Sequence, residues 1–405
     1  MAPLLKRLIL HVGPHKTGTT SLQHHLATQR QALRQQGFVV PPILSLDNTP
    51  NNWYLVYVAC CDNERLAKYH NSVRGDHQPA DCAKLRERFT QTLDKELHSA
   101  RQQEPLGEQQ AIFSSEEVAF LRSDDWDHLY KLFLTHAERI EMVYYLRAPI
   151  DRLRSDLQQG VKGGTALTAE IFSKLPNQDL LRLRAMEPAP TLQPKIRLQV
   201  RPYRERQGSQ PWDVIADFLD GIGAQPPSPT SRPLAFNPSI TIELFSVVQD
   251  INKIMPALGP QGEYNRLRHH LHDAIENYRW TAEDHPFSLS QQDVDELWEQ
   301  QATGLQQLIA FCRAAAWIDL AEGCEQMLPA SNTLKILDIP GSVLDYKPDL
   351  SRAYYVNLIC HLWSYLRRVE RKGKGSPNQT PQLILYRFKR NLPVPQSAST
   401  LCWSA

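Results

Sequence analysis

The apolar residues of the chain gather in short runs, and polar or amphipathic stretches separate one run from the next. Some of these runs have the length and the almost unbroken apolar character of strands that are covered on both faces. They span residues 8–12, 38–40, 111–115, 142–146 and 196–200. The segments between them hold apolar residues three or four positions apart, which is the spacing of amphipathic helices. This alternation predicts an α/β fold, with a doubly wound parallel sheet flanked by helices.

The first predicted helix follows the first strand closely. Leu22, Leu26 and Leu33 share one stripe, and Gly37 is the expected C-cap. The longer stretch between the second and third strands, residues 45–110, is polar and mostly helical in pattern. Its early aromatic residues, which include Trp53 and Tyr57, either line a substrate cleft or pack in the core. Burial tendencies favour the core.

The second half of the chain changes character after the fifth strand. Residues 225–238 contain five prolines and predict a linker that crosses the surface. Residues 239–327 are helical in pattern, so we expect one domain over residues 1–327, with a sheet followed by a helical part. Residues 328–405 are expected to form a C-terminal extension.

Charge and cysteine content narrow the class of protein. The chain of 405 residues has a formal net charge of +1, so no global field points to nucleic acid or to a membrane surface. Its 7 cysteines are odd in number and form no Cys-x-x-Cys pair, which indicates neither a disulfide framework nor a zinc site. No apolar run approaches membrane-spanning length, and the first residues lack a signal-peptide pattern. We therefore expect a cytoplasmic protein.

The most informative stretch is the loop Gly13-Pro14-His15-Lys16-Thr17-Gly18-Thr19-Thr20, between the first strand and the first helix. A helix N-terminus at the end of a strand presents converging N–H groups and a positive dipole, and Lys16 adds a full charge. The loop therefore predicts an anion site. It is not a Walker A sequence, because Lys16 precedes Gly18 instead of following it.

Other charged residues follow later strands of the predicted sheet. Right-handed crossovers bring the carboxyl ends of parallel strands to one edge, where ligands bind in such folds. Glu116, Arg147 and Arg201 come after the third, fourth and fifth strands. We expect all of them to share that edge with the Lys16 loop.

The loop order Pro-x-Lys-Thr-Gly-Thr-Thr resembles the 5′-phosphosulfate loop of sulfotransferases that use 3′-phosphoadenosine 5′-phosphosulfate. The chain is similar to the bacterial carbohydrate and polysaccharide members of that family over about residues 8–325. Arg147 and Ser155, 8 positions apart, resemble the family pair that binds the 3′-phosphate. A guanidinium fork and a neutral hydroxyl donor both suit a phosphate.

The resemblance implies a donor site and a reaction. Lys16 and the N–H groups of Thr17, Gly18, Thr19 and Thr20 would bind the 5′ end of the donor. Tyr203 would face the adenine, although packing against the next helix is an equal alternative. The implied enzyme transfers a sulfuryl group to a hydroxyl or amine, with a carbohydrate as the expected acceptor. The family needs no metal.

The attacking hydroxyl needs a general base. Glu116 occupies the place after the third strand where the family carries its base, and His15, beside Lys16, is a second catalytic candidate. Glu117 should point to the opposite side if strand geometry persists. The alternative for Glu116 is a role at the start of the next helix, through the helix dipole. His11, inside the first strand, is expected to be a packed residue.

Two other functions remain compatible with the fold. A P-loop kinase is disfavoured by the position of Lys16 and by the lack of a clear magnesium-binding Asp after an apolar strand. A non-catalytic nucleotide-binding or scaffold protein is permitted by the fold alone. The presence of Lys16, Arg147, Ser155 and Glu116 argues against it.

Overall fold

The computed structural model describes residues 5–41, 51–74, 81–102, 109–168, 179–203, 206–207, 210–225, 239–254, 256, 272, 275, 285–314 and 321. The chain divides into two compact units. The first comprises Met1–Ala148, Asn177–Phe236 and Thr303–Pro329, and the second comprises Pro149–Pro176, Asn237–Ala302 and Ala330–Ala405. Almost all of the predicted linker and of the C-terminal extension lie outside the described residues, so both stay predictions.

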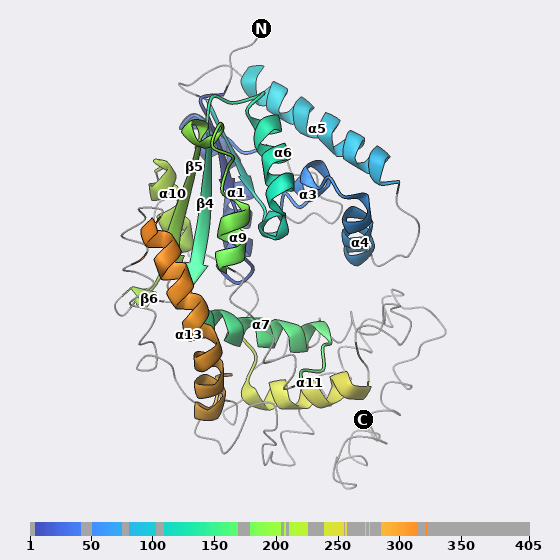
Figure 1. Ribbon diagram of the computed structural model, residues 1–405, viewed down its shortest axis with the longest axis vertical. Helices are drawn as coiled ribbons and strands as arrows, with labels where there is room; N and C mark the ends of the chain where they lie inside the picture. Colours follow the sequence, from blue (N-terminus) through green and yellow to red (C-terminus); the bar gives the residue numbers. More distant parts are fainter. Residues whose placement is uncertain are drawn as a thin grey trace. The chain divides into compact units, whose positions relative to one another are not determined.

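The first unit is built on a five-stranded sheet in which every neighbouring pair of strands is parallel (Figure 1). Its strands are β1 (Arg7–His11), β2 (Phe38–Val39), β3 (Gln110–Ser114), β4 (Ile140–Arg147) and β5 (Ile196–Tyr203). They lie in the order β2-β3-β1-β4-β5. All eight residues of β4 are buried, as expected of a strand covered on both faces. The α/β parallel-sheet fold predicted from the sequence is confirmed.

One face of the sheet is covered by α1 (Thr19–Thr28), α2 (Arg30–Gln35) and α10 (Val214–Ile222). Leu22, Leu26 and Phe218 belong to one buried cluster with strand residues Ile9 and Val143. The predicted first helix is interrupted at Gln29, which caps α1 and begins α2. The C-cap of α2 is Gln36, and Gly37, the expected C-cap, lies one residue beyond it with a left-handed φ of 86°.

The opposite face of the sheet carries a second helical layer. Its helices are α3 (Leu55–Ala59), α4 (Asn63–Arg74), α5 (Cys82–Gln102), α6 (Ser123–Phe133) and α9 (Asp179–Ala185). Phe113 of β3 stacks on Phe133 with ring centroids 5.8 Å apart. Trp53 and Tyr57 are buried against Phe89 of α5, which confirms the core interpretation of these aromatic residues.

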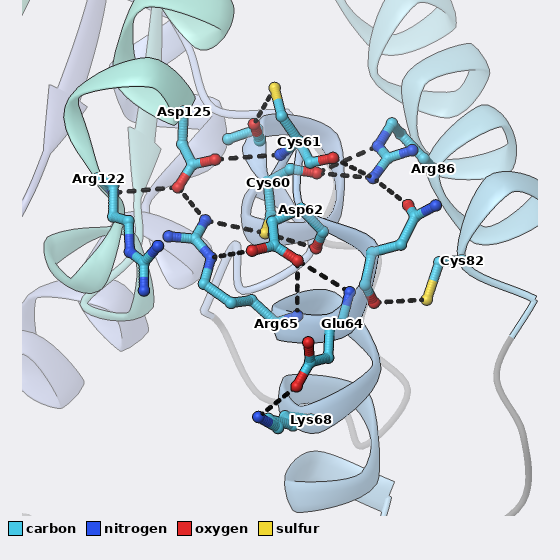
Figure 2. A network of polar contacts seen from close by, with 12 residues as sticks. Cys60, Cys61, Asp62, Glu64, Arg65, Lys68, Cys82, Arg86, Arg122 and Asp125 are labelled. Carbon is cyan, nitrogen blue, oxygen red and sulfur yellow. Dashed lines mark hydrogen bonds and ion pairs between the residues drawn. The ribbon is translucent and has the colours of Figure 1, made fainter.

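A polar network joins α3, α4 and α5 to α6 (Figure 2). The Asp125 carboxylate accepts hydrogen bonds from the Arg65 guanidinium and from the backbone N–H groups of Cys61 and Arg122. Arg86 donates to the carbonyl oxygen of Cys60 at the end of α3, at 2.8 Å. Among the described cysteines, Cys60, Cys61 and Cys82 are free thiols.

The second unit contains α7 (Pro149–Gly163) and α11 (Ile242–Ile254), which pack together. Gln249 of α11 donates to the Leu167 carbonyl at 2.7 Å and accepts from the Leu167 N–H at 3.0 Å.

The described elements of the chain that have not yet been named are short, apart from one helix. They are η1 (Glu117–Phe120), η2 (Gln193–Lys195), the antiparallel pair β6 (Arg206–Gln207) and β7 (Gln210–Pro211), and the helix α13 (Gln291–Ala314). Among the described helices, none is both long and apolar enough for a membrane span.

Helix α9 offers a matched test of the packing. Leu183 is fully buried, whereas Leu181, two residues away, is 64% exposed. Leu183→Ala should lower the free energy of unfolding by about 2–5 kcal/mol, because the vacated volume cannot be refilled. Leu181→Ala should change it by no more than about 0.5 kcal/mol. Urea unfolding of the three proteins measures both values, and equal losses would contradict the packing of α9.

Candidate functional site

The loop after β1 has a backbone that only particular residues tolerate. Lys16 and Gly18 adopt left-handed φ angles of 71° and 76°. A Cβ atom on Gly18 would lie 2.8 Å from Cγ1 of Val214, and one on Gly13 would lie 2.5 Å from Cγ2 of Thr19. The two glycines therefore let the loop fold tightly against the start of α1 and α10.

The threonines of the loop use their hydroxyl groups to hold its shape. The Thr17 hydroxyl donates to the Pro14 carbonyl at 2.8 Å, and the Thr19 hydroxyl donates to the Glu116 carboxylate. The N–H groups in the first turn of α1, those of Thr19 and Thr20, have no intrahelical acceptor by helix geometry. Together with the helix dipole and the Lys16 charge, they could bind an anion, and the predicted anion site stays a prediction.

Arg147 lies at this loop, as the sequence predicted. Its Nη1 atom donates to the Lys16 carbonyl at 2.7 Å, and its guanidinium lies 5.3 Å from the centre of the Tyr203 ring. Tyr203 in turn meets Trp212 edge to face, with ring centroids 5.0 Å apart. The ends of β1, β4 and β5 thus bring a lysine, an arginine and Tyr203 to one edge of the sheet, and Trp212, just before α10, packs on Tyr203.

Two other predicted positions have different outcomes. Ser155 lies half-buried on α7 in the second unit, so its pairing with Arg147 stays a prediction. The expectation for Arg201 is wrong, because β5 continues past it to Tyr203. The Arg201 guanidinium is held by the Asp217 carboxylate of α10 through two hydrogen bonds of 2.8 Å. Arg201 therefore links β5 to α10 and does not contribute to the loop after β1 through these hydrogen bonds.

Glu116 lies beside the loop, as expected of the predicted base. Strand β3 ends at Ser114, and Glu116 stands immediately before η1 without making a side-chain cap to it. Its carboxylate instead accepts from the Thr19 hydroxyl and lies 3.3 Å from Nδ1 of His15. The side chain therefore faces the loop. The alternative, in which Glu116 caps the start of the next helix, is not what the structure shows.

The expectation that Glu117 points away from Glu116 is wrong. Strand geometry does not persist beyond β3, because a 3-10 turn begins at Glu117. As a result His15, Glu116 and Glu117 each bring a ligand atom within 4.8 Å of the others, and the three side chains could hold a metal ion. The prediction that the reaction needs no metal stays a prediction.

Burial and charge act against each other in this cluster. Burial tends to raise the pKa of Glu116, but hydrogen bonds from His15 and Thr19 and the charge of Lys16 outweigh it and lower the pKa. Burial tends to lower the pKa of His15, and the hydrogen bond and charge of Glu116 raise it instead. Burial, with the neighbouring charge of Glu116, raises the pKa of Glu117. Adjacent carboxyl groups thus differ in proton affinity.

His11 lies closer to the loop than the sequence suggested. It is fully buried, as predicted, with its ring packed against those of Tyr145 and Phe218. The edge of its ring, however, lies close to the loop. A Cβ atom built on Gly13 would be 3.0 Å from Cε1 of the His11 ring. The only sequence feature that could have indicated this position is a histidine within an otherwise apolar strand, just before the loop that contains Gly13 and Gly18.

The ion pair of His15 and Glu116 predicts a shifted titration. In a Glu116→Gln variant the burial of His15 remains and its charged partner is lost, so its pKa should fall below the ordinary value of 6.5. Glu117→Gln should lower it less, because Glu117 acts on His15 through charge alone. Following the ring protons of His15 by NMR during a pH titration measures both shifts. An unchanged His15 pKa in Glu116→Gln would exclude the pair.

The same pair predicts how stability depends on pH. The raised pKa of His15 gives stabilisation that is complete below 6.5 and is lost as the pH rises through the folded-state pKa. The lowered pKa of Glu116 gives stabilisation that is present above 4.5 and is lost as the pH falls through its folded-state pKa. The melting temperatures of the wild type and Glu116→Gln should therefore differ most between pH 4.5 and 6.5. A difference that is constant from pH 4 to 9 would count against this coupling.

Comparison with known proteins adds little to this geometry. No family model and no curated protein matches the chain. Among solved structures, the chain is similar to a sulfotransferase domain from the curacin biosynthetic pathway, at 14% sequence identity and a TM-score of 0.30. The match covers 58% of this chain and 80% of that domain.

Proposed function

We propose that the protein is a sulfotransferase that moves a sulfuryl group from 3′-phosphoadenosine 5′-phosphosulfate to a hydroxyl group, with a carbohydrate as acceptor. The observation that carries the proposal is the hydrogen bond of 2.7 Å from Arg147 to the Lys16 carbonyl. It brings the Arg147 guanidinium to the loop that carries Lys16 and leads into the first N–H groups of α1. Such a concentration of positive charge fits a ligand with more than one anionic group.

The donor nucleotide suits the arrangement of these residues. Lys16 and the N–H groups of Thr17 to Thr20 would bind the 5′-phosphosulfate. Arg147, with Ser155, would bind the 3′-phosphate, for which a planar guanidinium is well shaped. Tyr203, packed between Arg147 and Trp212, would contact the adenine.

The reaction follows from the same residues. The acceptor oxygen attacks sulfur in line, so a new O–S bond forms while the bond from sulfur to the bridging phosphate oxygen breaks. Lys16 and the loop N–H groups stabilise the charge that grows on the leaving oxygen. Glu116 takes the proton of the acceptor, and 3′-phosphoadenosine 5′-phosphate leaves. Its lowered pKa keeps Glu116 ionised at neutral pH, as a base must be.

The nucleotide assignment is tested by binding. 3′-Phosphoadenosine 5′-phosphate should raise the melting temperature by mass action on the folded state, and ATP, which lacks a 3′-phosphate, should bind much more weakly. Arg147→Ala should weaken binding of the first nucleotide by about 10-fold or more and weaken binding of ATP less, because ATP would feel only the loss of the contact with the loop. Arg34→Ala, a change at an exposed position of α2, is the matched control. Equal affinity for both nucleotides would refute the assignment.

The base is tested by turnover. Glu116→Gln keeps the shape of the side chain and an acceptor for the Thr19 hydroxyl, but removes the basicity. It should cut turnover by about a hundredfold or more while nucleotide affinity stays nearly constant. Glu117→Gln should reduce turnover less. The assignment is overturned if Glu116→Gln turns over normally and either Glu117→Gln or His15→Ala does not.

A further inference from the structure

His11 is a polar side chain enclosed in the middle of the first unit. It has no exposed surface, and its ring is packed between Tyr145, 5.8 Å away, and Phe218, 5.6 Å away. Such an aromatic cage would accommodate an apolar residue of similar size at no cost in hydrogen bonds. The presence of an imidazole in this position therefore calls for a polar partner.

One nitrogen of the ring has such a partner. Nδ1 lies 2.8 Å from the Ser114 hydroxyl oxygen on the neighbouring strand β3. Ser114 is itself held in place, because its N–H donates to the Asn52 side chain at 2.8 Å and its carbonyl accepts from the Asn52 N–H at 2.9 Å. This chain of contacts fixes the orientation of the imidazole and therefore the direction of its other nitrogen.

The other nitrogen, Nε2, is directed at the underside of the loop. A Cβ atom built on Gly13 would lie 3.1 Å from Nε2 and 2.5 Å from Cγ2 of Thr19. The ring edge thus lies close to Gly13, at the start of the loop. Among the described residues Nε2 has no hydrogen-bond partner. A buried polar atom of this kind costs stability, so it indicates a group that is completed by a ligand.

We propose that His11 is a neutral hydrogen-bond donor to the anion held in the loop, and that it reaches the 5′-phosphate group of the nucleotide from beneath. In this arrangement the Ser114 hydroxyl donates to Nδ1, which leaves the proton of the imidazole on Nε2. The inference rests on the proposed function and extends it, because it adds a binding residue from inside β1.

The electrostatics agree with a neutral donor. Burial lowers the pKa of His11 to about 4, although the nearby charge of Glu116 opposes this. The ring is therefore uncharged at physiological pH and offers a single N–H group. It orients the phosphate without adding a third cation to Lys16 and Arg147.

A pair of isosteric variants tests the proposal. In His11→Gln the side-chain amide nitrogen can replace Nε2, whereas in His11→Asn it can replace only Nδ1. The probes are 3′-phosphoadenosine 5′-phosphate and adenosine 3′-monophosphate, which lacks the 5′-phosphate. His11→Asn should weaken binding of the first by about 10- to 100-fold, the effect of one lost hydrogen bond to a charged group. His11→Gln should stay closer to the wild type, and neither variant should alter binding of the monophosphate.

A measurement on the unaltered chain covers the case in which a variant fails to fold. In ¹⁵N NMR spectra the His11 ring should show its proton on Nε2, and this proton should shift and exchange more slowly with solvent when 3′-phosphoadenosine 5′-phosphate is added. A proton on Nδ1 in both states would overturn the proposal, as would full nucleotide affinity in His11→Asn. If the wild type binds neither probe, the proposed function and this inference fall together. If it binds both and only the His11 results fail, the proposed function stands.

Discussion

The hydrogen bond between the Arg147 guanidinium and the Lys16 carbonyl is the interaction on which the site depends. It joins the end of β4 to the loop after β1, two segments separated by 131 positions in the chain. It also places a buried guanidinium against the backbone of the loop that carries Lys16. The parallel sheet fixes the ends of both strands and therefore the position of this contact. An anion bound at the loop would add a partner for the charge of Arg147.

Glu116 provides the opposite charge at the same loop. Its carboxylate holds the Thr19 hydroxyl at the start of α1 and the imidazole of His15 in the middle of the loop. The side chain therefore has a structural role in the loop as well as the proposed chemical one. The adjacent Glu117 belongs to the same cluster but has a raised pKa, so the two carboxyl groups are not equivalent.

The sequence predicted the sheet well because its signal is local. Buried parallel strands need unbroken apolar runs, and the residues that follow them must lie at one edge. Arg147 and Glu116 were placed at the loop by that rule alone. Glu117 was misplaced because no local signal marks the 3-10 turn that begins there, and Arg201 because β5 runs three residues further than its apolar part. The pairing of Thr19 with Glu116 spans 97 positions, and no pattern within one segment of the chain can reveal it.

The left-handed backbone at Lys16 sets stability against function. A non-glycine residue in this conformation costs roughly 1–2 kcal/mol, and glycine would relieve that strain. Selection for stability alone would therefore favour the loss of the one full positive charge that the loop carries. Homologues that keep a lysine at this position would reveal that they still need an anion there. A directed-evolution experiment that screens only for heat resistance would tend to erase the site without damaging the fold.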